Sequence, residues 1–212
     1  MKINLTIILL LVGLGLIGHG SYMQAKAWLA QWLIEDAWQS ALKTPEQQIK
    51  PWFYADSYVT AQLSWPSQDK TLTILSGASG RNLAFAPSHF LPSGEFGSDR
   101  GILIAGHNDT HFAFLQKVKV GEQFSLQTQN GVVEQYQVRG IDVIHQSQHE
   151  FLAKAGLYLL TCYPFNSLIS GTELRLLVSA SKLSADEVSA ANGLSDKVSF
   201  DKASSLTSIT NS

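Results

Sequence analysis

Cysteine is nearly absent from this sequence, and its scarcity excludes several kinds of site. Cys162 is the single cysteine among 212 residues, so neither an intramolecular disulfide nor a four-thiolate zinc or iron–sulfur site can form. Three histidines show no spacing relative to Cys162 that favours a metal: His89, His145 and His149. Residues 146–156 contain no calcium-ligand pattern. We therefore expect no metal and no cofactor.

Charge is also scarce. Charged residues make up 15% of the chain, against about 25% in typical soluble domains, and the formal net charge is −2. With no basic excess to hold a polyanion, we expect no sequence-independent binding to nucleic acid. Gly and Pro are modest in number and aromatic residues reach 10%, which excludes a collagen-like or wholly disordered chain.

Part of the charge deficit lies at the N-terminus, where no acidic residue precedes Glu35. Residues 3–17 are apolar except Asn4 and Thr6, and the run can be extended to Met23. As a helix, residues 3–23 are about 31 Å long, which matches a bilayer core. Lys2 favours leaving the N-terminus in the cytoplasm and sending the rest of the chain across. Residues 1–23 are therefore predicted to be a transmembrane signal-anchor.

A cleaved signal peptide is the alternative, with Ala25-Lys26-Ala27 as a small-x-small cleavage site. Against cleavage, apolar side chains continue at helical spacing beyond this site, and two tryptophans suit a membrane interface. These residues are Trp28, Leu29, Trp32, Leu33 and Ala37. Both interpretations place the remaining chain outside the cytoplasm.

The remaining chain divides into three parts. Residues 24–57 are predicted to be a membrane-proximal helix, ending near Thr44-Pro45, followed by a linker. Residues 58–181 contain short alternating runs typical of strands, and about eight strands with little helix predict a closed or nearly closed barrel. The expected strands are 59–64, 71–76, 101–105, 122–128, 132–138, 140–145, 157–161 and 173–180, with helical turns near 79–86 and 111–118. Residues 182–212 are serine-rich and predicted to be a polar, disordered tail.

Cys162 follows an apolar strand, residues 157–161, and precedes Tyr163-Pro164, which ends that strand. A thiol at this position is either a small hydrophobic core residue or a nucleophile. As a nucleophile it would need a base or a cationic neighbour to react at neutral pH.

His107 also stands where a strand gives way to a loop, after residues 101–106. It either bonds its own turn or acts as an acid or base, and Gly106 would allow backbone and substrate to approach closely. His111 competes for the same role but precedes two phenylalanines that resemble core anchors. Asp109 could orient His107, although an aspartate at this position more often bonds its own turn.

Arg175 lies within an apolar strand, and a barrel interior would reject an unpaired guanidinium. It either points outward and pairs with Glu173 or another surface acid, or points into a groove beside Cys162. In the groove it would offer fixed donors to a developing oxyanion.

Together these residues resemble the sortase family over residues 58–181. Leu159-Leu160-Thr161-Cys162 resembles the family's T-L-x-T-C motif, with Tyr158 in place of the first threonine. Ile104-Ala105-Gly106-His107 resembles the catalytic-histidine segment, and Arg175 matches the arginine on the strand after the cysteine. The stretches 77–81 and 107–112 are similar to the Gram-negative, marine proteobacterial branch of the family.

The resemblance implies a mainly β protein, an eight-stranded sortase-like barrel with short helices, and a cysteine transpeptidase activity. Its substrate would be an exported protein with a C-terminal sorting motif similar to LPxTG. Cys162 would attack the Thr–Gly bond, His107 would protonate the leaving amine, Arg175 would stabilise the oxyanion, and Thr161 would help to line the peptide groove. A thioester acyl-enzyme would then pass to an amine acceptor, which the sequence does not identify. The enzyme would be single-pass in the inner (cytoplasmic) membrane, with its barrel on the periplasmic side.

Two other classes of cysteine enzyme fit these residues less well. A papain-like peptidase places its cysteine before its histidine, whereas His107 precedes Cys162 here. The His-Gly-Cys neighbourhood of L,D-transpeptidases is absent, because Thr161 precedes the cysteine. A cysteine peptidase that only hydrolyses the same intermediate stays open. So does a non-catalytic, membrane-tethered barrel that binds an exported partner.

Overall fold

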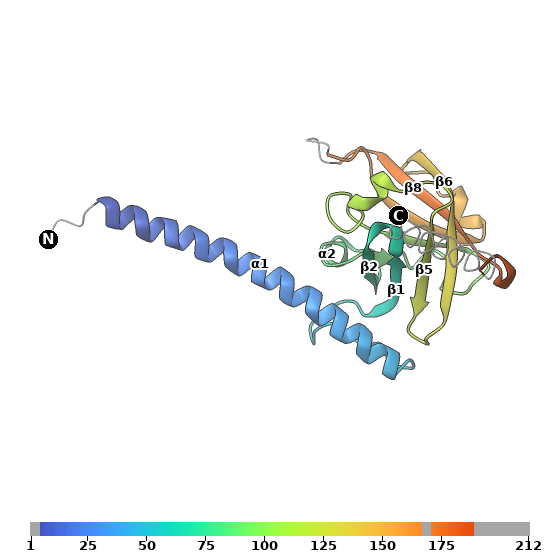
Figure 1. Ribbon diagram of the computed structural model, residues 1–212, viewed down its shortest axis with the longest axis horizontal. Helices are drawn as coiled ribbons and strands as arrows, with labels where there is room; N and C mark the ends of the chain where they lie inside the picture. The colour runs from blue at the N-terminus through green and yellow to red at the C-terminus, as the bar shows by residue number, and fades with distance from the viewer. Residues whose placement is uncertain (1–4, 167–170, 189–212) are drawn as a thin grey trace, which may run out of the picture.

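The computed structural model describes residues 5–166 and 171–188. The predicted anchor and the predicted membrane-proximal helix form one continuous helix, α1 (Leu5–Lys43), which projects far beyond the barrel at its N-terminal end (Figure 1). The helix ends where Thr44 turns its hydroxyl back to donate to the Ser40 carbonyl (3.0 Å), immediately before Pro45. By length and composition, Ile7–Lys43 is a candidate membrane span, and its N-terminal part is exposed.

The remaining elements form a closed barrel within the described residues, which confirms the predicted fold. Its strand order is β1-β2-β3-β4-β7-β8-β6-β5. The strands are β1 (Val59–Trp65), β2 (Lys70–Ser76), β3 (Ser88–His89), β4 (Gly101–Ala105), β5 (Gln123–Thr128), β6 (Val133–His145), β7 (Gly156–Cys162) and β8 (Leu174–Lys182). Short helices join them: η1 (Pro66–Gln68), α2 (Gly80–Leu83), η2 (Ala113–Lys117) and η3 (Glu150–Ala153).

Two predicted strand assignments need correction. The runs 132–138 and 140–145 are one strand, β6, because the chain passes Gly140 as a bulge against β8 rather than turning there. The two-residue strand β3 was not predicted. It bridges β2 and β4, pairing in parallel with the former and antiparallel with the latter.

Alternation along the strands separates a barrel interior from an outer face. Leu157 and Leu159 of β7 point into the main core, whereas Tyr158 belongs to a separate apolar cluster with Leu103 of β4 and Leu177 of β8. This outer cluster carries the site described below.

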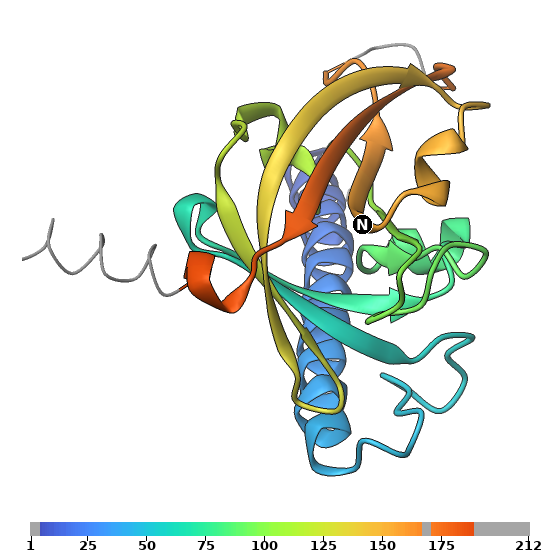
Figure 2. The ribbon, with the colours of Figure 1, turned by 90° about the vertical axis from the view of Figure 1, so that its right-hand side faces the viewer.

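The C-terminal half of α1 packs along the outside of β1 and β2 (Figures 1 and 2). Ile34, Ala37, Trp38 and Ala41 are buried in one cluster with three residues of the barrel, namely Val59, Leu75 and Ala86. Glu35 of α1 accepts hydrogen bonds from Gln62 (3.1 Å) and Thr73 (3.3 Å) of the barrel. This half of the helix is thus part of the domain.

The predicted tail begins with ordered residues. Lys182 is the last residue of β8, and its Nζ lies 2.6 Å from the Glu134 carboxylate. A helical turn follows, in which Ser184 and Glu187 bond each other's backbone and side chain as a capping box. The rest of the predicted tail, residues 189–212, lies outside the described residues.

Candidate active site

The strands β4, β7 and β8 bring the three predicted catalytic residues into one row. β4 and β7 run parallel with Ala105 beside Leu160, and the Gly106 N–H continues the ladder to the Leu160 carbonyl (3.1 Å). Counted on from the Ala105–Leu160 pair, His107, two residues beyond the end of β4, comes level with Cys162. On the other side of β7, Cys162 lies directly opposite Arg175 in the antiparallel pairing with β8. Neighbouring strands are about 4.8 Å apart, so the row is short.

The row lies on the outer face of the barrel. Cys162 follows Tyr158 in the alternation along β7, and Arg175 follows Leu177 along β8, both on the side of the outer apolar cluster. Cys162, His107 and Arg175 are each half-buried. The thiol and the guanidinium are therefore held on strands, and the imidazole on the loop directly after β4, while all three stay reachable from solvent.

Thr161 does not line this groove. Its side chain points to the barrel interior with only 2% exposed, and its hydroxyl donates to the Gly106 carbonyl at 2.7 Å. Thr161 precedes Cys162 directly, so its side chain faces the opposite side of the sheet. Instead of contacting substrate, as predicted, it holds the backbone of Gly106. The bond links the cysteine strand to the segment that carries His107.

Gly106 also has a different role from the one expected. A Cβ at this position would lie 2.7–3.0 Å from ring atoms of Phe112, so glycine is required by the packing of that ring. Phe112 in turn donates its N–H to the His107 carbonyl (2.9 Å), and Asn108 donates to the Pro164 carbonyl (3.2 Å). These contacts fix the loop after β4 against the loop after β7.

The guanidinium of Arg175 is anchored by three hydrogen bonds. Its Nη1 donates to the carbonyls of Leu174 (2.8 Å) and Thr172, and its Nη2 donates to Oε1 of Gln146 (2.8 Å). The alternative ion pair with Glu173 is not formed, since that carboxylate lies 3.3 Å from Nε2 of His145. Gln146 was not predicted as a site residue, although it opens the polar segment 146–156.

An apolar floor lies beneath the row. Leu103, Tyr158 and Leu177 form its buried centre, and η3 folds over its edge with Phe151 and Leu152 packed against it. Its centre is buried and supports the row, whereas Phe151 and Leu152 at the edge are only partly buried.

A second imidazole stands near the row. Burial lowers the pKa of His111, the charge on His107 lowers it further, and the charge on Asp109 acts in the opposite direction. Asp109 is exposed and His111 is half-buried. Among the described residues, no three His, Cys, Asp or Glu side chains cluster as a metal site would require.

A thiol opposite a guanidinium on neighbouring strands, with an imidazole on the adjoining loop, is a side-chain set suited to acyl transfer through a cysteine. The family model for the sortase domain matches residues 63–183, more than half of the chain. The chain therefore belongs to the sortase family and is a sortase-type cysteine transpeptidase.

Solved sortase structures share the fold. Sortase A from Corynebacterium diphtheriae matches with a TM-score of 0.55 and 21% identity, covering 79% of this chain and 96% of that one. Sortase C-1 from Actinomyces oris matches with a TM-score of 0.53 and 24% identity, over 58% and 71% of the two chains. Sortase C1 from Streptococcus suis matches with a TM-score of 0.53 and 26% identity, covering 61% of this chain and 76% of that one. Comparison with curated protein sequences gives no significant match.

Proposed function

We propose that this protein is a membrane-anchored cysteine transpeptidase that cleaves a C-terminal sorting motif similar to LPxTG in an exported protein. The observation that carries the proposal is that Cys162 of β7 lies opposite Arg175 of β8, with His107 on the loop after β4, the other neighbour of β7. The product acyl group passes to an amine acceptor whose identity the residues do not define.

The first half of the reaction forms a thioester. The Cys162 thiolate attacks the carbonyl carbon of the Thr–Gly bond, and the C–S bond forms as the carbonyl π electrons move to oxygen. His107, as imidazolium, donates its proton to the glycine nitrogen as the C–N bond breaks. The free amine leaves, and the threonine carbonyl stays on sulfur.

The second half reverses these roles. The incoming amine attacks the thioester carbonyl, neutral His107 takes the surplus proton from its nitrogen, and the C–S bond breaks to regenerate the thiolate. Hydrolysis uses the same intermediate with water as the nucleophile, so the acceptor alone distinguishes a transpeptidase from a peptidase.

Arg175 is proposed to stabilise the oxyanion in both halves. A guanidinium has five N–H groups in a fixed plane. Three are used within the described residues, by Thr172, Leu174 and Gln146. Two stay available for the oxyanion, and the three bonds fix the plane of the guanidinium before substrate arrives.

Helix α1 supports membrane anchoring. Its exposed N-terminal part is long and apolar enough to span a bilayer. With Lys2 at the cytoplasmic side, the protein is proposed to be single-pass in the inner (cytoplasmic) membrane. The barrel and its substrate then lie on the periplasmic, extracytoplasmic side.

The test uses the full chain in lipid nanodiscs with a motif peptide, with and without triglycine. We expect a mass increase on Cys162 equal to the acyl fragment, and a triglycine-linked product that replaces the hydrolysed one. Cys162→Ala and His107→Ala should abolish both, whereas His149→Ala, which alters an exposed histidine, should retain them. An unmodified Cys162 and no cleavage would favour the non-catalytic tethered barrel. Hydrolysis that triglycine never diverts would favour the peptidase.

A further inference from the structure

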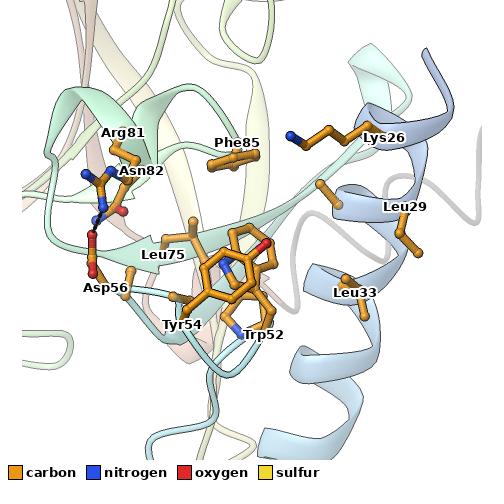
Figure 3. Close-up of a pocket in the computed structure, with 14 residues that line it drawn as sticks. Lys26, Leu29, Leu33, Trp52, Tyr54, Asp56, Leu75, Arg81, Asn82 and Phe85 are labelled. Carbon is orange, nitrogen blue, oxygen red and sulfur yellow. Dashed lines mark hydrogen bonds and ion pairs between the residues drawn. The ribbon is translucent and has the colours of Figure 1, made fainter. Parts of the chain in front are cut away.

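A groove of about 390 Å³ separates α1 from the barrel, away from the catalytic row (Figure 3). We call it the membrane-side groove. Leu29 and Leu33 of α1 form one wall, and Trp52, Tyr54 and Phe85 of the barrel form the other. The Trp52 and Phe85 rings meet edge to face, with centroids 5.0 Å apart. The walls are therefore mostly apolar, although the groove is open to its surroundings.

The height of the groove above the bilayer follows from α1. Because the helix is continuous, Lys26 lies about 4.5 Å and Leu33 about 15 Å beyond Met23, the end of the predicted span. The headgroup layer on each side of a bilayer core is roughly 5–7 Å thick. The lower end of the groove is thus at the level of the lipid headgroups. In Figure 1, α2 lies on the side of the barrel that faces the free half of α1.

Exposed aromatic side chains lie on α1 just beyond the headgroup level and on the chain next to the groove. Trp28 and Trp32 of α1 are 80% and 62% exposed, and Phe53 and Tyr54 next to the groove are 93% and 67% exposed. Large aromatic side chains left in contact with solvent are typical of the membrane interface. The surface around the groove is therefore suited to lipid.

The charges at the groove favour an anion. Lys26 and Arg81 lie at its edges, and the Lys26 side chain extends across the opening toward Phe85 (Figure 3). Asp56, the single carboxylate among the lining residues, pairs with Arg81. One positive charge, that of Lys26, is left at the headgroup level.

We propose that the membrane-side groove binds a phospholipid of the bilayer in which α1 is anchored. One acyl chain leaves the bilayer core and lies between Leu29, Leu33 and the aromatic wall, and the phosphate, at the headgroup level, is held by Lys26. Bound lipid ties the barrel to the membrane surface and sets the orientation of the catalytic row above it. The inference rests on the membrane anchoring proposed above and is independent of the catalytic chemistry.

The test uses the full chain in phosphatidylglycerol nanodiscs that contain a phospholipid with a photoreactive diazirine on its acyl chain. After irradiation, we expect lipid adducts on peptides covering 51–57 and 81–85 as well as on the predicted span. Lys26→Glu should lower the groove adducts about fivefold or more, the factor that corresponds to about 1 kcal/mol for one basic residue at an anionic surface. Tyr54→Ser should also lower them.

Lys43→Glu is the matched control, since it makes the same charge change on an exposed residue of the same helix, far from the bilayer. It should leave the adducts unchanged. All three variants should cleave a soluble motif peptide at the wild-type rate, which reports a folded barrel.

Adducts confined to the span would overturn lipid docking while supporting the anchor. Adducts absent from the span as well would overturn the anchor. Amine cross-links from Lys26 to another copy of the chain would assign the groove to a dimer contact and overturn the proposal. Cys162→Ala should not change the labelling, so failure of catalysis and failure of docking are distinguishable.

Discussion

Three hydrogen bonds hold the guanidinium of Arg175 in place, and they predict how the reaction rate responds to substitution of this residue. Arg175→Lys keeps the positive charge but loses the planar arrangement of donors. We expect kcat to fall about 100-fold or more, the usual cost of losing an oxyanion donor, with a much smaller change in KM. Steady-state peptide cleavage measures both constants. Arg139→Lys, at an exposed arginine of β6, is the control and should be near wild type.

Gln146 acts only through Arg175, so its substitution should have a smaller effect. Gln146→Ala removes the acceptor of the Nη2 bond (2.8 Å), and a hydrogen bond is worth about 1 kcal/mol, or about fivefold in rate. We expect kcat to fall by this factor, whereas Gln146→Ala combined with Arg175→Lys should be no worse than Arg175→Lys alone. Fully additive losses in the double variant would show that Gln146 does not act through the guanidinium.

Glu122 makes the stability of the barrel depend on pH. Partial burial alone would raise its pKa. Hydrogen bonds from Gln68, Ser67 and Trp65 and from the Lys119 N–H outweigh burial and lower the pKa. A carboxyl group with a lowered folded pKa stabilises the fold above its unfolded pKa, and this contribution is lost as the pH falls through the folded value. We expect the Tm difference between wild type and Glu122→Gln to be largest at pH 7 and to shrink toward pH 3. A constant difference would contradict this account.

At the scale of elements, Gly106 couples the packing of the loop after β4 to the position of His107. Gly106→Ala would place a methyl group within 3.0 Å of the Phe112 ring. We expect an overpacking cost of roughly 1–3 kcal/mol, measured by thermal unfolding, together with loss of most peptide cleavage because the loop carrying His107 must shift. Gly131→Ala is a useful comparison, because it is strained by a φ of +81° but has open space around it and lies in the β5–β6 turn. It should lose stability without a specific loss of kcat.

The strands that alternate over five residues or more were predictable, because their pattern records which face is buried. β3 was not, since two residues cannot show an alternating pattern. β6 was predicted as two strands because a glycine such as Gly140 is typical of turns as well as of β-bulges. The pairing of Cys162 with Arg175 agrees with the order of the motifs. The direction of Thr161 and the contact of Gln146 did not, because both depend on register between strands that lie far apart in the sequence.

At the scale of the whole molecule, the C-terminal half of α1 packs against the barrel and its N-terminal half projects away from it. Residues that pack against the barrel begin at Ala30, and the cluster includes the fully buried Trp38. A chain that starts at residue 25 should therefore stay folded and monomeric. A chain that starts at residue 45 should lose roughly 3 kcal/mol or more, the cost of one buried tryptophan alone, and expose Val59 and Leu75. Thermal unfolding and gel filtration compare the two. Equal Tm values would show that the helix is dispensable for stability.

The parallel contact between β4 and β7 has a consequence for the timing of activity. His107 directly follows the earlier of these two strands and Cys162 ends the later one, and Arg175 is supplied only by β8, the last strand of the barrel among the described residues. In the export proposed for this chain, the site therefore stays incomplete until residue 175 has crossed the membrane and β8 has closed the ring of strands. A chain caught earlier holds the thiol without the guanidinium, so acyl transfer begins only once the barrel has assembled.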